Sequence, residues 1–208
     1  MTAGKGSWQE RITPVSPSHF PEVALMTDQP ITSFVVLDFW WQAGPEKWFA
    51  KDDKFDKRCR ERFLPAIEDA AEGKLDAWAE TADGALALLI LLDQFPRNVF
   101  RGSPKAFRAD PKAVQIAEIA LDRGFDRAFP KDARSFFYLP FEHSEDMAHQ
   151  ERSVDLCRVL GIQETYHYAL IHLDVIRRFG RFPHRNEVLG RESTPEEIAY
   201  LKSGGFSA

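Results

Sequence analysis

The chain has 208 residues, of which 44% are hydrophobic and 28% are charged, and its formal net charge is −5. This length and composition are typical of one globular domain that buries a sizeable core. The acidic balance provides no general attraction for a polyanion, so we predict no nucleic-acid partner.

The N-terminal segment differs from the rest of the chain. Residues 1–25 carry charges and several prolines, and they lack the apolar core of an export signal. Met26 is followed directly by Thr27-Asp28-Gln29-Pro30, a pattern that precedes helices. We therefore predict a flexible tail over residues 1–25 and a helical domain over residues 26–208.

Apolar runs and cysteines indicate the compartment. The longest apolar run, Ala85–Leu92, is far shorter than the roughly 20 residues that cross a bilayer, so no membrane partner is predicted. Cys59 and Cys157 show no paired spacing, which favours reduced, buried thiols. Together these features predict a cytoplasmic protein.

Helix signals follow one another along the rest of the chain, and alternating strand patterns are almost absent, which predicts an all-α fold. Glycine and proline mark the expected ends, with Asp110 as an N-cap and a capping box at Thr194–Glu197. Short links predict antiparallel helical hairpins in a tetratricopeptide-like array, although no clean period of about 34 residues is visible. The expected helices cover about 30–41, 53–71, 82–94, 110–124, 142–160, 164–179 and 195–204.

Two polar segments share a pattern. Phe95–Asn98 and Phe182–Asn186 both combine Phe-Pro with Arg and Asn after an apolar helix, and we expect each to form a shaped loop. In a structural interpretation the arginines cap helix-end carbonyls and the asparagines close turns. In a functional interpretation the guanidinium groups bind a carboxylate or a phosphate. The candidate ligand-binding residues are Arg97, Asn98, Arg181, His184, Arg185 and Asn186.

A third cluster lies where the helix over 142–160 is expected to begin, and it places Glu142, Glu145, Asp146 and His149 on one helical face. These acids either stabilise the helix N-terminus or line a pocket in which His143 and Asp146 act as polar ligands or as a catalytic acid–base pair. A carboxylate–histidine metal site would need two Glu-x-x-His motifs, and only Glu164-x-x-His167 is intact, so no metal is predicted. His172 is expected to be a buried histidine bonded to a carbonyl.

Three separated motifs resemble one known family: Leu92–Asn98, Tyr138–Asp146, and Arg178–Arg191 followed by Ser193–Glu197. The chain is similar over about residues 31–201 to the bacterial "domain of unknown function 924" family. The resemblance implies a tetratricopeptide-like helical fold and transfers no activity or catalytic residue. The family usually has an acidic residue where this chain has His149, which argues further against a histidine metal site there.

Three functions stay open at this stage. The main hypothesis is a binding module that holds a small anionic molecule or an acidic peptide in an Arg/His-lined concavity. The alternatives are an enzyme that uses His143 and Asp146 on a phosphorylated or carboxylated metabolite, and a protein-binding scaffold whose arginines are purely structural. Nucleotide, hydrolase and zinc-peptidase signatures are absent, and no cofactor is predicted.

Overall fold

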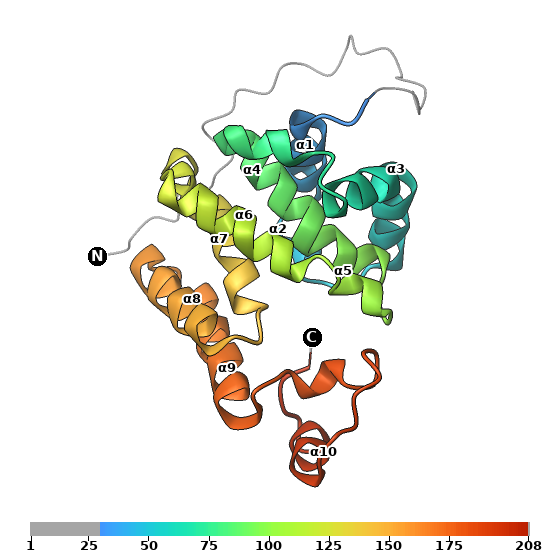
Figure 1. Cartoon of the computed structure of the whole chain (residues 1–208), viewed down its shortest axis with the longest axis vertical. Helices are drawn as coiled ribbons and strands as arrows, with labels where there is room; N and C mark the ends of the chain where they lie inside the picture. Colours follow the sequence, from blue (N-terminus) through green and yellow to red (C-terminus); the bar gives the residue numbers. More distant parts are fainter. Residues whose placement is uncertain (1–29, 208) are drawn as a thin grey trace, which may run out of the picture. The chain divides into compact units, whose positions relative to one another are not determined.

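Helices make up all the regular structure of residues 30–207, which are the residues that the computed structural model describes (Figure 1). The prediction of an all-α fold is therefore confirmed, whereas the expected flexible tail at 1–25 lies outside the described residues. No helix within 30–207 is long and apolar enough to span a bilayer. The α-helices are α1 (Ser33–Ala43), α2 (Pro45–Trp48), α3 (Asp53–Ala71), α4 (Ala82–Leu89), α5 (Phe95–Val99), α6 (Asp110–Asp122), α7 (Lys131–Glu142), α8 (Met147–Leu160), α9 (Gln163–Phe179) and α10 (Pro195–Lys202).

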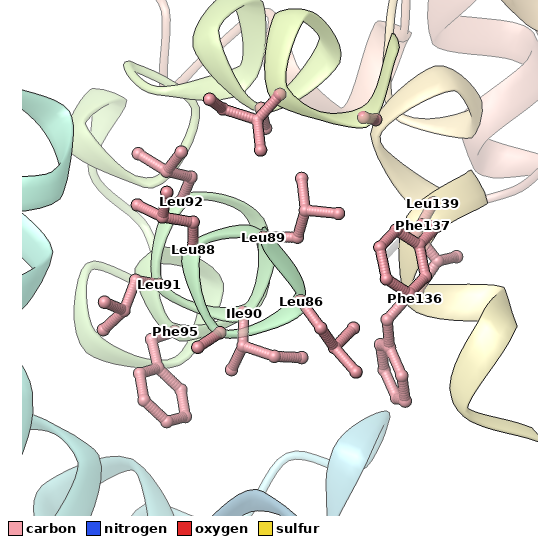
Figure 2. Packing of buried hydrophobic residues seen from close by; sticks show 14 of the residues in the cluster. Leu86, Leu88, Leu89, Ile90, Leu91, Leu92, Phe95, Phe136, Phe137 and Leu139 are labelled. Atoms are coloured by element: carbon pink, nitrogen blue, oxygen red, sulfur yellow. The ribbon is translucent and has the colours of Figure 1, made fainter. Parts of the chain in front are cut away.

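The core is built around α4, which is apolar on nearly every side because other helices surround it. It contacts α1, α6 and α7. Figure 2 shows Leu86, Leu88 and Leu89 pointing to different sides of this helix, with Phe136 and Phe137 of α7 lying to one side. A helix with no solvent-facing side loses the amphipathic pattern of a surface helix and reads as a continuous apolar run.

The chain continues from α4 without the loop that the sequence suggested. Ile90–Gln94 form a π-helical turn that leads directly into α5. Pro96 therefore lies inside a continuous helical stretch, directly after a π-helical turn in which the Phe95 N–H donates to the backbone oxygen of Ile90. The expectation of a loop at Phe95–Asn98 was therefore wrong, and only the later Phe-Pro segment forms a turn, the 3₁₀ turn Pro183–Arg185.

The expected helix over 142–160 is also corrected. The chain forms α7, which ends at Glu142, and then α8, which begins at Met147 with Asp146 as its N-cap. Glu142 and His149 consequently belong to different helices and do not share one helical face. The sequence analysis missed α7, which contains Pro140, because proline is read as a probable helix boundary.

The C-terminal part follows the predicted stop signals. Helices α8 and α9 end at Gly161 and Gly180, whose φ angles of 75° and 69° are left-handed and favour glycine. The two helices pack side by side after a two-residue link, and α10 begins with the predicted capping box at Thr194. Cys59 and Cys157 are buried and free. The tetratricopeptide-like arrangement stays a prediction.

Candidate functional site

A pocket of about 580 Å³ lies between α6, the link from α7 to α8, and the turn Pro183–Arg185. Its polar lining includes His143, Ser144 and Arg185, and its apolar lining includes Phe107 and Val114. The pocket therefore combines two of the predicted site residues with apolar walls.

Asp110 joins the two Arg-Asn segments at the edge of this pocket. Its carboxylate accepts two hydrogen bonds of 3.1 Å from the guanidinium of Arg97 and one of 3.4 Å from Nη1 of Arg185. The structure does not use Asp110 as the N-cap of α6, because Ala109 occupies that position and Asp110 begins the helix. One buried carboxylate is therefore shared between two arginines that are far apart in the sequence.

The guanidinium of Arg97 forms hydrogen bonds or ion pairs with two acidic residues. Besides Asp110, its Nη1 donates to the backbone oxygen of Asp93 at 2.6 Å and lies 3.1 Å from Oδ1 of the same residue. Arg97 does not line the pocket. Its charge is paired with two carboxylates, that of Asp93 and that of the pocket-lining Asp110.

Asp93 and His143 form a hydrogen bond between a carboxylate and an imidazole at the site. Both carboxylate oxygens of Asp93, which is fully buried at the end of the π-helical turn, lie 2.8 and 2.9 Å from Nδ1 of His143. Burial alone would raise the pKa of Asp93, but the charge of Arg97 and the interactions with His143 lower it to about 2. Because an ionised carboxylate only accepts hydrogen bonds, Nδ1 carries the proton of this contact.

The surroundings of His143 favour its neutral form. Burial lowers the pKa of its imidazole, and the positive charge of Arg97 lowers it further, whereas Asp93 acts in the opposite direction. The side chain keeps 15% of its surface exposed where it lines the pocket. Within residues 30–207, no group forms a hydrogen bond with Nε2, so its lone pair is available.

Arg185 is held differently from Arg97. Its guanidinium lies between the rings of Phe107 and Phe182, 4.5 and 4.4 Å from their centroids, and the side chain is only 7% exposed. The contact with Asp110 is the one hydrogen bond that it forms with described residues, and its Nε is buried without a partner there. Burial lowers the pKa of Arg185 to about 10, so the group stays charged at neutral pH.

Glu142 and His172 lie behind His143. His172 Nδ1 donates to the backbone oxygen of Tyr168 at 2.8 Å, which confirms the predicted buried, carbonyl-bonded histidine, and it also lies 3.2 Å from Oε1 of Glu142. Burial, with the nearby charge of Asp93, raises the pKa of Glu142 to about 8. At neutral pH this carboxyl group is mostly protonated.

The other predicted site residues do not line the pocket. Asn98 donates to Asp56 of α3, and Asp146 accepts from the backbone of α8 as its N-cap. Arg181 and Asn186 both bond Glu197 of α10, which agrees with a structural role for this part of the turn. His184 packs between the rings of Phe182 and Phe206, and burial lowers its pKa to about 4. Within 30–207, no group of His, Cys, Asp and Glu side chains has the geometry of a metal site.

Comparison with known proteins places the chain in a family. Residues 36–205 match the sequence model of the family described as "Bacterial protein of unknown function (DUF924)". The chain belongs to the DUF924 family. It is also similar to the solved structure of a protein of unknown function from Agrobacterium tumefaciens, with 50% sequence identity, a TM-score of 0.80, and coverage of 83% of this chain and 97% of that one. No curated protein gives a significant match.

Sequence reasoning missed Asp93 and Phe107 in this DUF924 protein, and it assigned Asp110 to a cap. The sequence did contain an indication that Asp93 has a partner. This carboxylate directly follows the apolar run Ala85–Leu92, and it has to be paired if the helix continues into the core. The sequence contained no such indication for Phe107, since a single aromatic residue in a connecting segment does not reveal the arginine that it contacts.

Proposed function

We propose that the pocket binds a small oxyanion, a carboxylate or a phosphate, and that Arg185 is its main charged contact. The observation that carries this proposal is the state of Arg185, a buried guanidinium with one long hydrogen bond and an unpartnered Nε among the described residues. Buried charges are normally paired and hydrogen-bonded. An oxyanion in the pocket would supply an additional acceptor to the terminal nitrogens of this weakly bonded guanidinium.

The hydrogen bonds around Arg185 favour an anionic rather than a cationic ligand. Glu145 and Glu118 also line the pocket, but Glu145 is paired with Arg191 and Glu118 with Arg152. Asp110 is shared with Arg97, whose contacts to it are shorter and bidentate, so Asp110 only partly neutralises Arg185. The rings of Phe107 and Phe182 fix the plane of the guanidinium. A planar fork held in one orientation suits the two oxygens of a carboxylate or phosphate.

The apolar lining narrows the ligand class. Phe107, Val114 and Leu189 line the same pocket as Arg185 and His143. Apolar area that is covered by a ligand adds roughly 25 cal/mol per Å² to the gross binding free energy. We therefore expect an organic anion with an apolar group, such as an aryl carboxylate or phosphate, to bind more tightly than the inorganic ion.

The test is isothermal titration calorimetry with sulfate, inorganic phosphate, benzoate and phenyl phosphate. Because a hydrogen bond to a charged group contributes about 1.5–3 kcal/mol, Arg185→Ala should weaken binding by roughly 10- to 100-fold. Arg177→Ala is the matched control, since it removes an exposed arginine of α9 and changes the net charge equally. Equal affinity in the two variants, with folding verified by circular dichroism, would refute the proposal.

Acid–base catalysis on the bound anion is a second function, and the contact between Asp93 and His143 favours it. A histidine acts as a general base when a carboxylate orients it and a substrate comes within hydrogen-bond reach. The carboxylate in contact with His143 is that of Asp93, whereas Asp146, which was predicted to form an acid–base pair with His143, caps α8. The first requirement of such an enzyme is that Nε2 of His143 accepts a proton while the pocket is occupied.

A further inference from the structure

We propose that His143 takes up a proton at Nε2 when an oxyanion binds beside Arg185, so that the pocket binds an anion and a proton together. This inference rests on the proposed anion-binding function and adds a second ligand, the proton, to the same site.

The hydrogen-bond geometry identifies the atom that accepts the proton. Nδ1 of His143 is committed to the Asp93 carboxylate at 2.8 and 2.9 Å. The remaining nitrogen, Nε2, belongs to a side chain that lines the pocket together with Arg185 and has no partner among the described residues. Protonation at Nε2 makes both nitrogens donors, one to Asp93 and one to the bound anion.

The charges around His143 explain why the proton arrives only with the anion. Without an anion, burial disfavours an imidazolium ion at His143, and the charge of Arg97 disfavours it further, while the charged Arg185 lines the same pocket. An oxyanion at Arg185 adds negative charge on the pocket side and reverses part of this effect. The titratable and charged groups around His143 are Asp93 of the π-helical turn, Arg97 of α5, Asp110 of α6, Glu142 of α7, His172 of α9, and His184 and Arg185 of the turn after α9. Four more line the same pocket: Arg108, Glu118, Glu145 and His149.

The step itself is a simple proton transfer. An N–H bond forms at Nε2, and the proton comes from a buffer acid or from hydronium, which leaves its conjugate base in solution. No bond of the anion is formed or broken. Asp93 is a positioning residue here, because it fixes the ring through Nδ1 and stabilises the imidazolium that forms.

Sulfate is the probe for this test because, unlike phosphate, it does not itself titrate near neutral pH. Calorimetric titrations at about pH 7 in several buffers of different ionisation enthalpy, at one ionic strength set with sodium chloride, give the number of protons taken up per sulfate. We expect net uptake of up to one proton in the unmodified protein. In His143→Asn the side-chain amide still donates to Asp93 but cannot titrate, so uptake should disappear.

His149→Asn is the matched control, because His149 lines the same pocket but bonds Ser144 and makes no contact with Asp93. This variant should keep the uptake. In the unmodified protein, the ¹⁵N resonance of His143 Nε2 should move from the range of an unprotonated nitrogen to that of a protonated one as sulfate is added. This measurement does not depend on whether any variant folds.

The outcomes separate the two proposals. Sulfate binding that depends on Arg185 but brings no proton, or equal uptake in the His143→Asn variant, would overturn the inference and leave anion binding intact. An Nε2 resonance that does not move while sulfate binds would also overturn it. If neither sulfate nor the organic anions bind, the proposed function fails and the inference fails with it.

Discussion

Glu142 provides a direct test of the electrostatics behind the pocket. Its side chain is only 4% exposed, its Oε2 has no partner among the described residues, and its pKa is raised from 4.5 to about 8. Glu142→Gln replaces this mostly protonated acid with a neutral side chain of nearly the same shape. We expect the variant to be more stable than the unmodified protein at neutral and alkaline pH.

The sign and size of this effect follow from proton linkage. Between pH 4.5 and about 8 the folded state keeps the proton of Glu142 and the unfolded state loses it, so the stability that this proton contributes is complete at low pH and disappears as the pH rises through 8. At about 1.4 kcal/mol per pKa unit, the loss is about 3 kcal/mol at pH 7 and about 5 kcal/mol above pH 8. Glutamine has no such proton, so the variant should not show this loss.

The assay is urea unfolding of both proteins at several pH values between 5 and 9. The difference in free energy of unfolding should grow with pH and level off above about 8. Glu151→Gln, which changes an exposed acid of α8, is the control and should show no such growth. A pH-independent difference, or a Glu142→Gln variant that is less stable at pH 9, would refute the assignment of a buried, protonated carboxyl.

Two further substitutions separate structural charges from those of the pocket. Arg181→Ala removes the hydrogen bonds to Glu197 at 2.7 and 2.9 Å, so it should lower the melting temperature in differential scanning calorimetry while sulfate affinity stays the same. A loss of sulfate affinity would instead place Arg181 in the binding site. Asp110→Asn leaves Arg97 and Arg185 buried with one carboxylate fewer, which should cost about 3 kcal/mol in denaturant unfolding. The same variant should bind sulfate more tightly, because a competing negative charge is gone, and weaker binding would contradict the proposed role of Arg185.

Local signals in the sequence were sufficient for much of the fold. The glycines at 161 and 180 end α8 and α9 as predicted, and Thr194 and Glu197 form the predicted capping box. These features depend on residues within a few positions of one another, so the sequence contains all the information they require. The motifs that resemble DUF924 also identified the family correctly.

Buried elements were harder to predict from local signals. Helix α7 was missed, and Phe95–Asn98 was expected to be a loop, because Pro140 and Pro96 are local helix-breaking signals, yet both prolines lie inside helical segments. In both cases, packing against the rest of the core decides the conformation, and it overrides the local preference of proline.

The sequence by itself determined the all-α class, most helix ends, the family, and the presence of arginine- and histidine-rich segments. Tertiary structure alone decided which of these groups meet: Asp93 lies 50 positions from His143, and Asp110 lies 75 positions from Arg185. Such pairings depend on how the helices pack, and a charged residue carries no local sign of the partner that will neutralise it. For that reason the sequence indicated the types of residue at the site, whereas the partner of each one became visible only in the folded chain.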